Sequence, residues 1–263
     1  MTRDRFSLAG RRALVTGASS GIGRALAVGL AEQGAELVLH HFGDAAGAAE
    51  TAGAAGGRAP VLEADFTRDG DASRLAGEVI ERYGPIDILL ANAAIERRAP
   101  WTEISAAHVV THLSANLMSL LTLAQRLVPP MTERGWGRVV ATGSVMASRP
   151  RAETVAYAAL KSAQLTTVRA IARDVAPRGV TINVVSPGAI EIGKNADRYA
   201  DPAFRRAVAA KIPAGRPGRP EDLVGAVLFL CSDAAAYVTG VDIPVDGGWT
   251  IGDAPGMLPG EAV

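Results

Sequence analysis

The chain has 263 residues, of which 48% are hydrophobic and 21% charged, and its 27 Lys and Arg balance 27 Asp and Glu to a net charge of zero. This composition is typical of a globular protein and excludes a largely disordered chain. Because a neutral balance gives no basic surplus for nucleic acid or anionic lipid, neither partner is expected.

The cellular location is inferred from the cysteine content and the apolar runs. Cys231 is the single cysteine, so no internal disulfide can form and a reducing compartment is expected. The first residues show no apolar signal core, and no uninterrupted apolar run reaches the ~18 residues that a membrane helix needs. We therefore expect a soluble, unprocessed, cytoplasmic protein with no membrane partner.

Short apolar runs alternate with longer segments of helical period, as in parallel strands joined by crossover helices. Seven strands are predicted over residues 13–16, 36–40, 59–63, 86–91, 138–142, 180–185 and 241–245. Most are almost wholly apolar, as strands buried on both faces should be. Proline has no N–H to donate to a β-ladder, so Pro60 and Pro244 are expected at a strand end or toward an edge of the sheet.

Six or seven helices are predicted between these strands. They include segments 21–33, 73–83, 105–127, 154–176 and 221–231, and the Ala- and Gly-rich segment 45–57 lies where a crossover helix is required. No linker or repeat divides the chain, so residues 1–263 are expected to form one domain. The polar segment of about 189–215 breaks the alternation and is expected to form a lid. The tail 251–263 is either mobile or reaches a neighbouring subunit.

A glycine-rich turn follows the first predicted strand and opens the helix over 21–33. It carries Gly17, Gly21 and Gly23 in the spacing Gly-x-x-x-Gly-x-Gly. Glycines let the backbone approach a ligand closely, and a helix N-terminus offers unpaired N–H groups and partial positive charge. The turn is therefore predicted to hold a pyrophosphate, although glycine-rich turns also serve as plain connectors.

A tyrosine and a lysine stand four residues apart on the helix over 154–176. Tyr157 and Lys161 therefore project from one helical face, where the ammonium favours the phenolate. Lowering a tyrosine pKa from about 10 to about 7 takes about 4 kcal/mol, which the lysine and a cationic cofactor ring could supply. Ser144 follows the strand over 138–142, so we expect its hydroxyl at the carboxyl edge of the sheet, where ligands of parallel sheets bind.

Together these residues resemble the short-chain dehydrogenase/reductase family. The matching motifs are Thr16-Gly17-x-x-x-Gly21-Ile22-Gly23, Asn92-Ala93-Ala94, Asn116, Ser144, Tyr157-x-x-x-Lys161 and Pro187-Gly188. The match covers residues 8 to 250. It implies an α/β fold with a doubly wound, Rossmann-type seven-stranded parallel sheet and helices on both faces. It also implies hydride transfer between NAD(P)(H) and a secondary alcohol or ketone.

The resemblance assigns roles to four residues. Tyr157 would be the general acid/base, and Lys161 would lower its pKa and bind the nicotinamide ribose. Ser144 would hydrogen-bond the reacting oxygen, and Asn116 would hold a water that links Lys161 to solvent. The residues expected to bind the cofactor are Gly17, Ser19, Ser20, Gly21, Ile22, Gly23, His41, Phe42, Asp65, Phe66, Asn92, Ala93, Ala94, Tyr157, Lys161, Pro187, Gly188, Ile190 and Ile192.

The chain departs from the family pattern at three places. Ala94 stands where a glycine is usual, and Ile192 where a threonine usually binds the nicotinamide carboxamide, so backbone groups near Ile190 and Ile192 would have to serve. At the end of the second strand, the run His40-His41-Phe42 places a histidine where an acidic residue would select NAD. The choice between NAD and NADP therefore stays open. Asp65 resembles the adenine-binding aspartate of the family, or it caps the next helix.

The substrate class also stays open. A 3-oxoacyl thioester reductase and a sugar or polyol dehydrogenase are the nearest alternatives, and a non-catalytic nucleotide sensor lies outside the enzyme class. The predicted pocket is lined by Ser144, Met146, Ala147, Tyr157, Gly188 and Ala189, with contributions from Glu96 and Trp101. Four arginines, here called the arginine group, could attract an anionic substrate: Arg97, Arg98, Arg149 and Arg151.

Two further expectations concern metal and assembly. His108 and His112 are four residues apart on one helix, but no third ligand is near, so no metal site is expected. By resemblance, a homotetramer or homodimer would form through the long helices over 105–127 and 154–176.

Overall fold

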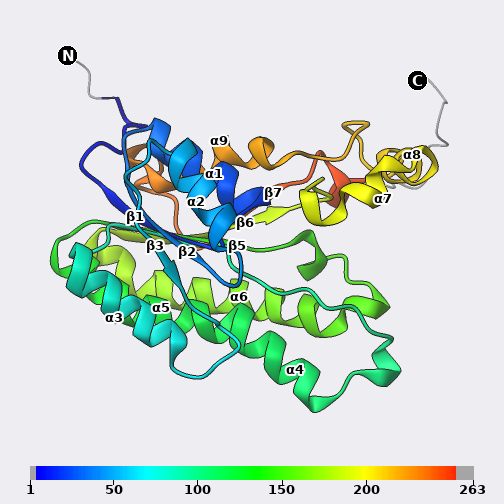
Figure 1. Cartoon of the computed structure of the whole chain (residues 1–263), viewed down its shortest axis with the longest axis horizontal. Coiled ribbons are helices and arrows are strands. Elements are labelled where there is room, and N and C mark those ends of the chain that lie inside the picture. Colours follow the sequence, from blue (N-terminus) through cyan, green and yellow to red (C-terminus); the bar gives the residue numbers. More distant parts are fainter. Residues whose placement is uncertain (1–3, 253–263) are drawn as a thin grey trace.

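The computed structural model describes residues 4–252, which form one sheet between two helical layers (Figure 1). Its seven parallel strands run in the order β3-β2-β1-β4-β5-β6-β7. Their bounds are β1 Arg12–Thr16, β2 Glu36–His41, β3 Val61–Glu63, β4 Ile88–Ala91, β5 Gly137–Thr142, β6 Val180–Pro187 and β7 Asp242–Val245. From β1 the chain first winds toward β3 and then, from β4, toward β7. The fold is therefore the predicted doubly wound, Rossmann-type sheet, with its switch point between β1 and β4.

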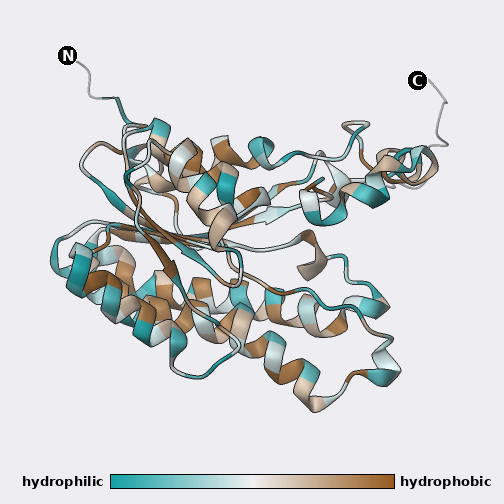
Figure 2. Cartoon of the chain, in the orientation of Figure 1, coloured by the Kyte–Doolittle hydropathy of each residue, from teal (hydrophilic) through white to brown (hydrophobic). Residues whose placement is uncertain are grey.

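The central strands form because their side chains are apolar on both faces. All four residues of β4 and all eight of β6 are buried. In the parallel register Leu14 of β1 lies between Val38 of β2 and Leu89 of β4. The strands accordingly form a continuous hydrophobic layer in the middle of the molecule (Figure 2).

The two prolines lie at the two edges, as predicted. Pro60 directly precedes the edge strand β3, and Pro244 lies in the edge strand β7. The carbonyl oxygens of Val241 and Val245 accept bonds from Val184 of β6 and from Gly188 just after it. Residues 241, 243 and 245 thus face β6, and Pro244 belongs to the outward-facing row. No ladder bond is lost, because the missing N–H would point away from the sheet.

Helices cover both faces of the sheet (Figure 1). α1 Gly21–Glu32, α2 Ala45–Ala54 and α9 Val224–Cys231 lie on one side. α3 Asp71–Tyr83, α4 Ala106–Leu113, α5 Ser119–Glu133 and α6 Val155–Val175 lie on the other. Each face of the sheet has its own hydrophobic core, and alternate residues of β1 pack into the two cores. Leu14 packs in one, and Ala13 and Val15 pack in the other.

The helix predicted over 105–127 is longer and is interrupted. α4 leads into a π-helical turn, Ser114–Met118, and then into α5, which runs through Pro129 and Pro130 to Glu133. Within the described residues, this continuous helix over Ala106–Glu133 is the one long and apolar enough to cross a membrane by length and composition alone. In the structure α5 packs against α3 and the sheet (Figure 1).

Residues 4–252 contain nine α-helices, more than the six or seven predicted. One reason is the split of the long helix into α4 and α5. The other is the segment after β6, expected as a lid, for which no helix was predicted; it forms α7 Ala196–Ala200 and α8 Pro202–Ala209. Pro202 is the first residue of α8, where proline is tolerated, and Asp201 caps it by accepting the Ala203 N–H.

Candidate functional site

The glycine turn between β1 and α1 is built so that two backbone segments almost touch. Gly17 has φ +66°, and a Cβ there would lie 2.9 Å from the Cα of Ala93. A Cβ at Gly23 would lie 1.9 Å from the Gly17 carbonyl oxygen. Any larger residue would push α1 away from the turn, so the sequence has glycine at both positions.

The start of α1 fits the phosphates of a dinucleotide. Ser20 is the N-cap, yet its side chain makes no capping bond, and the first turn of α1 has no acidic residue. The first N–H groups of the helix and its partial positive charge are therefore available to an anion. Ser19, Gly21 and Ile22 lie in the same turn.

Around the end of β2, the imidazole of His40 joins three elements. Its Nδ1 accepts the Gly17 N–H at 3.2 Å, its Nε2 bonds the Ala64 carbonyl oxygen at 3.0 Å, and its ring stacks on Phe66 at 4.3 Å. Burial lowers the pKa of His40 to about 4, so the ring is neutral at pH 7. The sequence analysis did not single out this role, which only the fold reveals.

The residues expected to contact the adenosine lie around the ends of β2 and β3. His41 is buried and its Nδ1 has no hydrogen-bond partner, whereas Phe42 is exposed. Asp65 does not cap α3, whose N-cap is Gly70. Instead, its Oδ1 accepts the N–H and the hydroxyl of Thr67. The alternative reading of Asp65 as a helix cap is therefore wrong.

Asn92 ties three strand ends together beneath the glycine turn. Its Nδ2 donates to the carbonyl oxygens of Thr16 and Gly17, and its Oδ1 accepts the hydroxyl of Thr142. The Thr16 hydroxyl in turn accepts the N–H groups of Asn92 and Ala93. Ala94, where the family usually has glycine, is exposed, so its methyl group fits without crowding the backbone.

Ser144, Tyr157 and Lys161 meet at the carboxyl end of β5. Ser144 caps the turn after β5 by accepting the Met146 N–H, and its hydroxyl lies near enough to the Tyr157 hydroxyl to lower the pKa of that group. Lys161, one turn along α6, places its Nζ 5.6 Å from the centre of the Tyr157 ring. All three side chains are buried.

The charge environment of Tyr157 differs from the expectation. Burial raises the pKa of Tyr157 above its ordinary value, the charge of Glu96 raises it further, and the bond to Ser144 lowers it. The predicted lowering by Lys161 is therefore not seen in the protein alone. Burial also lowers the pKa of Lys161 to about 8, which weakens its hold on a proton near neutrality.

The buried ammonium of Lys161 has two partners in the structure. Its Nζ donates to the Thr142 carbonyl oxygen at 2.6 Å and to Oε1 of Gln164 at 3.3 Å. Asn116 lies in the π-helical turn, and its side chain binds both the N–H and the carbonyl oxygen of Ile95. The side-chain amide of Asn116 thus holds the loop after β4. Its main-chain carbonyl oxygen accepts a hydrogen bond from Gln164 of α6.

The segment after β6 closes over the glycine turn. Pro187 ends β6, and a Cβ at Gly188 would lie 2.7 Å from the Cα of Asp246. The side chain of Ile192 packs beside Gly21. Asn195 binds the Ile192 N–H and the Ile190 carbonyl oxygen, the backbone groups expected to replace the usual threonine.

The charge of Glu96, on the loop after β4, acts on the pKa of Tyr157, and Glu96 is paired with Arg98 at 2.8 Å. Trp249 packs against the cluster of Met146, Tyr157 and Ala158. This tryptophan was missed by the sequence analysis because it lies far along the chain. Trp101, which the sequence suggested, is exposed.

The arginine group is not uniform. Arg149 donates to the Trp249 carbonyl oxygen, and the Arg151 guanidinium lies 5.7 Å from the Trp249 ring centre. Arg97 and Arg98 are exposed on the loop after β4. Arg149 and Arg151 thus lie at Trp249, and Arg98 is paired with Glu96.

The two histidines of α4 stack on each other with ring centres 4.4 Å apart. His112 is buried; its Nε2 accepts the Arg97 N–H and its Nδ1 bonds the His108 carbonyl oxygen. Both ring nitrogens of His112 are therefore engaged: Nε2 holds the loop that carries Glu96, and Nδ1 bonds the preceding turn of α4. Within residues 4–252 no group of three His, Cys, Asp or Glu could hold a metal ion.

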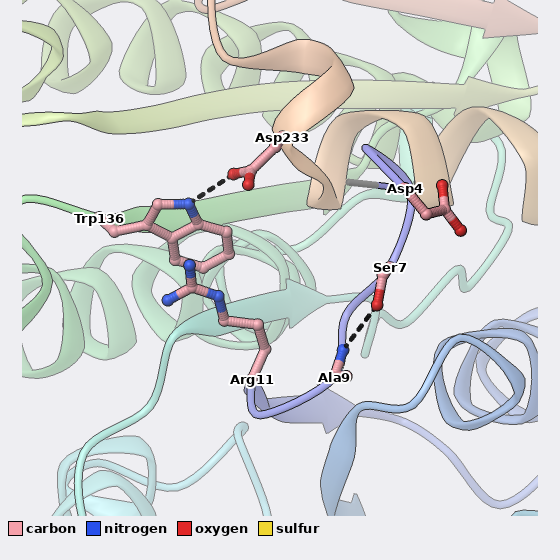
Figure 3. Close-up of a pocket in the computed structure, with 6 residues that line it drawn as sticks. All are labelled: Asp4, Ser7, Ala9, Arg11, Trp136 and Asp233. Carbon is pink, nitrogen blue, oxygen red and sulfur yellow. Dashed lines mark hydrogen bonds between the residues drawn. The ribbon is translucent and has the colours of Figure 1, made fainter. Parts of the chain in front are cut away.

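A cavity of about 230 Å³ lies elsewhere, at the amino edge of the sheet (Figure 3). Arg11 covers the Trp136 ring at 3.6 Å, and the indole N–H donates to Asp233 at 2.8 Å. These contacts fasten the segment before β1 to the start of β5, remote from Tyr157. A second cavity of about 200 Å³ lies between the carboxyl end of β7 and the segment after β6.

The sequence and the structure both match known proteins. The family model described as enoyl-(acyl carrier protein) reductase matches residues 17–250. The chain belongs to the short-chain dehydrogenase/reductase family. It is an NAD(P)-dependent oxidoreductase that interconverts alcohol and ketone groups of a small-molecule substrate.

Members of the family with high similarity differ in their substrates. Gluconate 5-dehydrogenase of Gluconobacter oxydans is 39% identical, with 94% of this chain and 98% of that protein covered. A 3-oxoacyl (acyl-carrier-protein) reductase of Agrobacterium tumefaciens, solved with NADP, is 40% identical, covers 92% of this chain and 95% of its own, and has a TM-score of 0.87. A gluconate 5-dehydrogenase of Burkholderia cenocepacia, solved with NADP and tartrate, is 35% identical, covers 95% and 99%, and has a TM-score of 0.87.

Proposed function

We propose that the protein is a dehydrogenase/reductase of a small polyhydroxy acid. The observation that carries this proposal is Glu96, a partly buried carboxylate whose charge raises the pKa of Tyr157 and which is paired with Arg98. A carboxylate in the pocket wall accepts hydrogen bonds from substrate hydroxyls, but it is a costly neighbour for an acyl chain. The arginine group supplies positive charge for the acid group of the substrate.

We assign the chemical roles to Ser144, Tyr157 and Lys161. The Tyr157 hydroxyl exchanges a proton with the reacting oxygen, and Ser144 holds that oxygen with a second hydrogen bond. When bound, the nicotinamide supplies or accepts the hydride. Lys161 gives positive charge beside the phenol and an N–H donor for the cofactor ribose.

We assign cofactor binding to the glycine turn and the strand ends around it. The close approaches at Gly17 and Gly23 hold the turn tightly against the start of α1, whose first N–H groups are unpaired and available to an anion. Ser19, Ser20, Gly21 and Ile22 would face the phosphates. The adenosine half would lie against His41, Phe42, Asp65, Phe66, Asn92, Ala93 and Ala94, and the nicotinamide half against Pro187, Gly188, Ile190 and Ile192.

We further propose that residues 1–263 are one nucleotide-binding domain with a lid over about 189–215, including α7 and α8. The protein would be a cytoplasmic homotetramer or homodimer. Val109, Val110 and Met118 are exposed apolar residues on α4 and the following turn, which supports association through this layer.

The test measures cofactor oxidation or reduction with NADPH and NADH separately. The substrate panel pairs gluconate with its uncharged analogue glucose and adds a 3-oxoacyl thioester. We expect turnover of the sugar acid, its loss in Tyr157→Phe with cofactor binding retained, and at least a tenfold drop in kcat/KM in Glu96→Gln.

Turnover of the thioester, with none of the sugar acid, would contradict the proposed substrate class. If Tyr157→Phe kept full activity with every substrate, the assignment of the proton to Tyr157 would be wrong. Loss of turnover of gluconate but not glucose after replacing Arg97 and Arg98 would locate the acid-binding part of the pocket.

A further inference from the structure

A buried glutamine lies one turn beyond Lys161 on α6. Gln164 is 2% exposed, while the next residues on the buried face of the helix are the apolar Val168 and Ala172. Burying a primary amide is costly unless its groups find hydrogen-bond partners. The hydrogen-bond partners of the Gln164 amide therefore indicate its role.

Both ends of the Gln164 amide are hydrogen-bonded, one to Lys161 and the other to the main chain at Asn116. Its Oε1 accepts from Lys161 Nζ at 3.3 Å, and its Nε2 donates to the carbonyl oxygen of Asn116 at 3.4 Å. The family resemblance led us to expect a water between Lys161 and Asn116. In this chain a side-chain amide spans the two groups.

The π-helical turn makes this link possible. Ser114–Met118 is wound more widely than an α-helix, and the Ser119 N–H bonds back to the Ser114 carbonyl oxygen. Such a turn interrupts the regular hydrogen-bond ladder of the helix. The Asn116 carbonyl oxygen accordingly accepts a donor from α6.

We propose that Gln164 is a positioning residue that holds the Lys161 ammonium beside Tyr157 by linking it to the main chain at Asn116. This inference rests on the role proposed above for Lys161. Gln164 does not touch the reacting atoms and acts only through the lysine.

The groups around the Lys161 ammonium determine how the loss of Gln164 would change the pKa of the lysine. Among residues 4–252, Lys161 donates to two acceptors, the Thr142 carbonyl oxygen and Gln164, and burial already disfavours its charge. The titratable groups of this cluster are Tyr157 on α6 and Glu96 on the loop after β4, whose charge acts on the tyrosine. Removing the Gln164 oxygen would favour neutral lysine, lower its pKa and leave the phenolate less stabilised.

The chain offers a direct readout because it contains three lysines, Lys161, Lys194 and Lys211. NMR titration of lysine labelled with ¹³C and ¹⁵N would resolve all three, and Lys194→Arg and Lys211→Arg would assign them. The two other lysines are exposed and serve as internal references. This measurement uses the full-length protein and needs no substrate.

In Gln164→Met, which keeps the length and volume of the side chain, we expect the pKa of Lys161 to fall by at least one pH unit. In Gln164→Glu the acceptor is retained and charged, so the pKa should rise above that of the wild type. Gln125→Met, at an exposed glutamine on α5, should leave Lys161 unchanged.

The kinetic counterpart is the pH profile of alcohol oxidation. Gln164→Met should move the acid limb of kcat/KM to higher pH and lower kcat about tenfold near pH 7, without a matching rise in the KM for substrate. A folded Gln164→Met protein with an unchanged Lys161 pKa and pH profile would overturn the proposal. If that variant did not fold, an unchanged pKa in Gln164→Glu would overturn it equally.

The two proposals fail in different ways. Absence of turnover with sugar acids would contradict the substrate class, but the NMR titration would still decide the role of Gln164. An unshifted Lys161 in an active Gln164→Met enzyme would reject the positioning role and leave the proposed function intact.

Discussion

At the scale of single residues, His40 shows how one neutral side chain connects the two halves of the nucleotide site. Its ring accepts the Gly17 N–H and bonds the Ala64 carbonyl oxygen. Protonation would turn the Nδ1 acceptor into a donor facing another donor. The folded state therefore resists the proton, in agreement with a pKa lowered by burial to about 4.

This lowered pKa predicts a stability change on acidification. Below the ordinary histidine pKa of 6.5, the unfolded chain binds a proton that the folded chain refuses until pH approaches 4, so the free energy of unfolding falls across this window. The ceiling of the effect is about 3 kcal/mol. His40→Phe cannot titrate, so urea unfolding should show the gap between variant and wild type narrowing from pH 7.5 to pH 4.5. Parallel pH dependences would argue against this role for His40.

At the scale of elements, the contact between α1 and the glycine turn has no spare room. In Gly23→Ala the new methyl group would collide with the Gly17 carbonyl oxygen. We expect cofactor affinity to fall at least tenfold in fluorescence titrations, with a loss of about 2 kcal/mol in the free energy of unfolding.

A matched control lies in the middle of α3. A Cβ at Gly77 would meet nothing closer than 3.9 Å, so Gly77→Ala should stabilise the protein by about 0.5–1 kcal/mol. It should leave cofactor affinity unchanged. Equal cofactor affinity in the two alanine variants would contradict the close-approach argument.

Some of the helices and strands could be predicted from the sequence, and others could not. Strands such as β4 and β6 could be predicted because burial on both faces demands apolar runs, and the edge prolines follow from missing donors. The continuation of α5 through Pro129 and the π-helical turn could not, because their apolar residues fit an ordinary helix equally well. α7 and α8 were missed because Pro202 reads as a breaker unless its place at a helix start is known.

The residues of the site also fall into those that could be predicted from the sequence and those that could not. Residues in motifs, such as Ser144, Tyr157 and Lys161, could be predicted from spacing and resemblance, and the structure brings them together. His40, Gln164 and Trp249 belong to no motif. Each has a partner far away in sequence, Gly17 for His40, Asn116 for Gln164 and Tyr157 for Trp249, so only the folded chain shows these contacts.

At the scale of the whole molecule, the exposed apolar residues of α4 and the following turn predict how copies associate. In Val110→Glu and Met118→Glu, a charge would enter the proposed contact, and we expect a smaller species by size-exclusion chromatography with light scattering. Tyr237→Glu, at an exposed position after α9, is the control and should keep the wild-type mass. An unchanged mass in both of the first variants would place the interface elsewhere.

Pro244 has a consequence for the border of the β7 strand. An approaching peptide strand needs an unbroken row of N–H donors to extend a sheet, and this outward row is interrupted at the proline. The other border is a strand of only three residues, β3. Both borders therefore disfavour continued growth of the sheet from one molecule to the next, which protects a chain rich in apolar strands against fibrous aggregation.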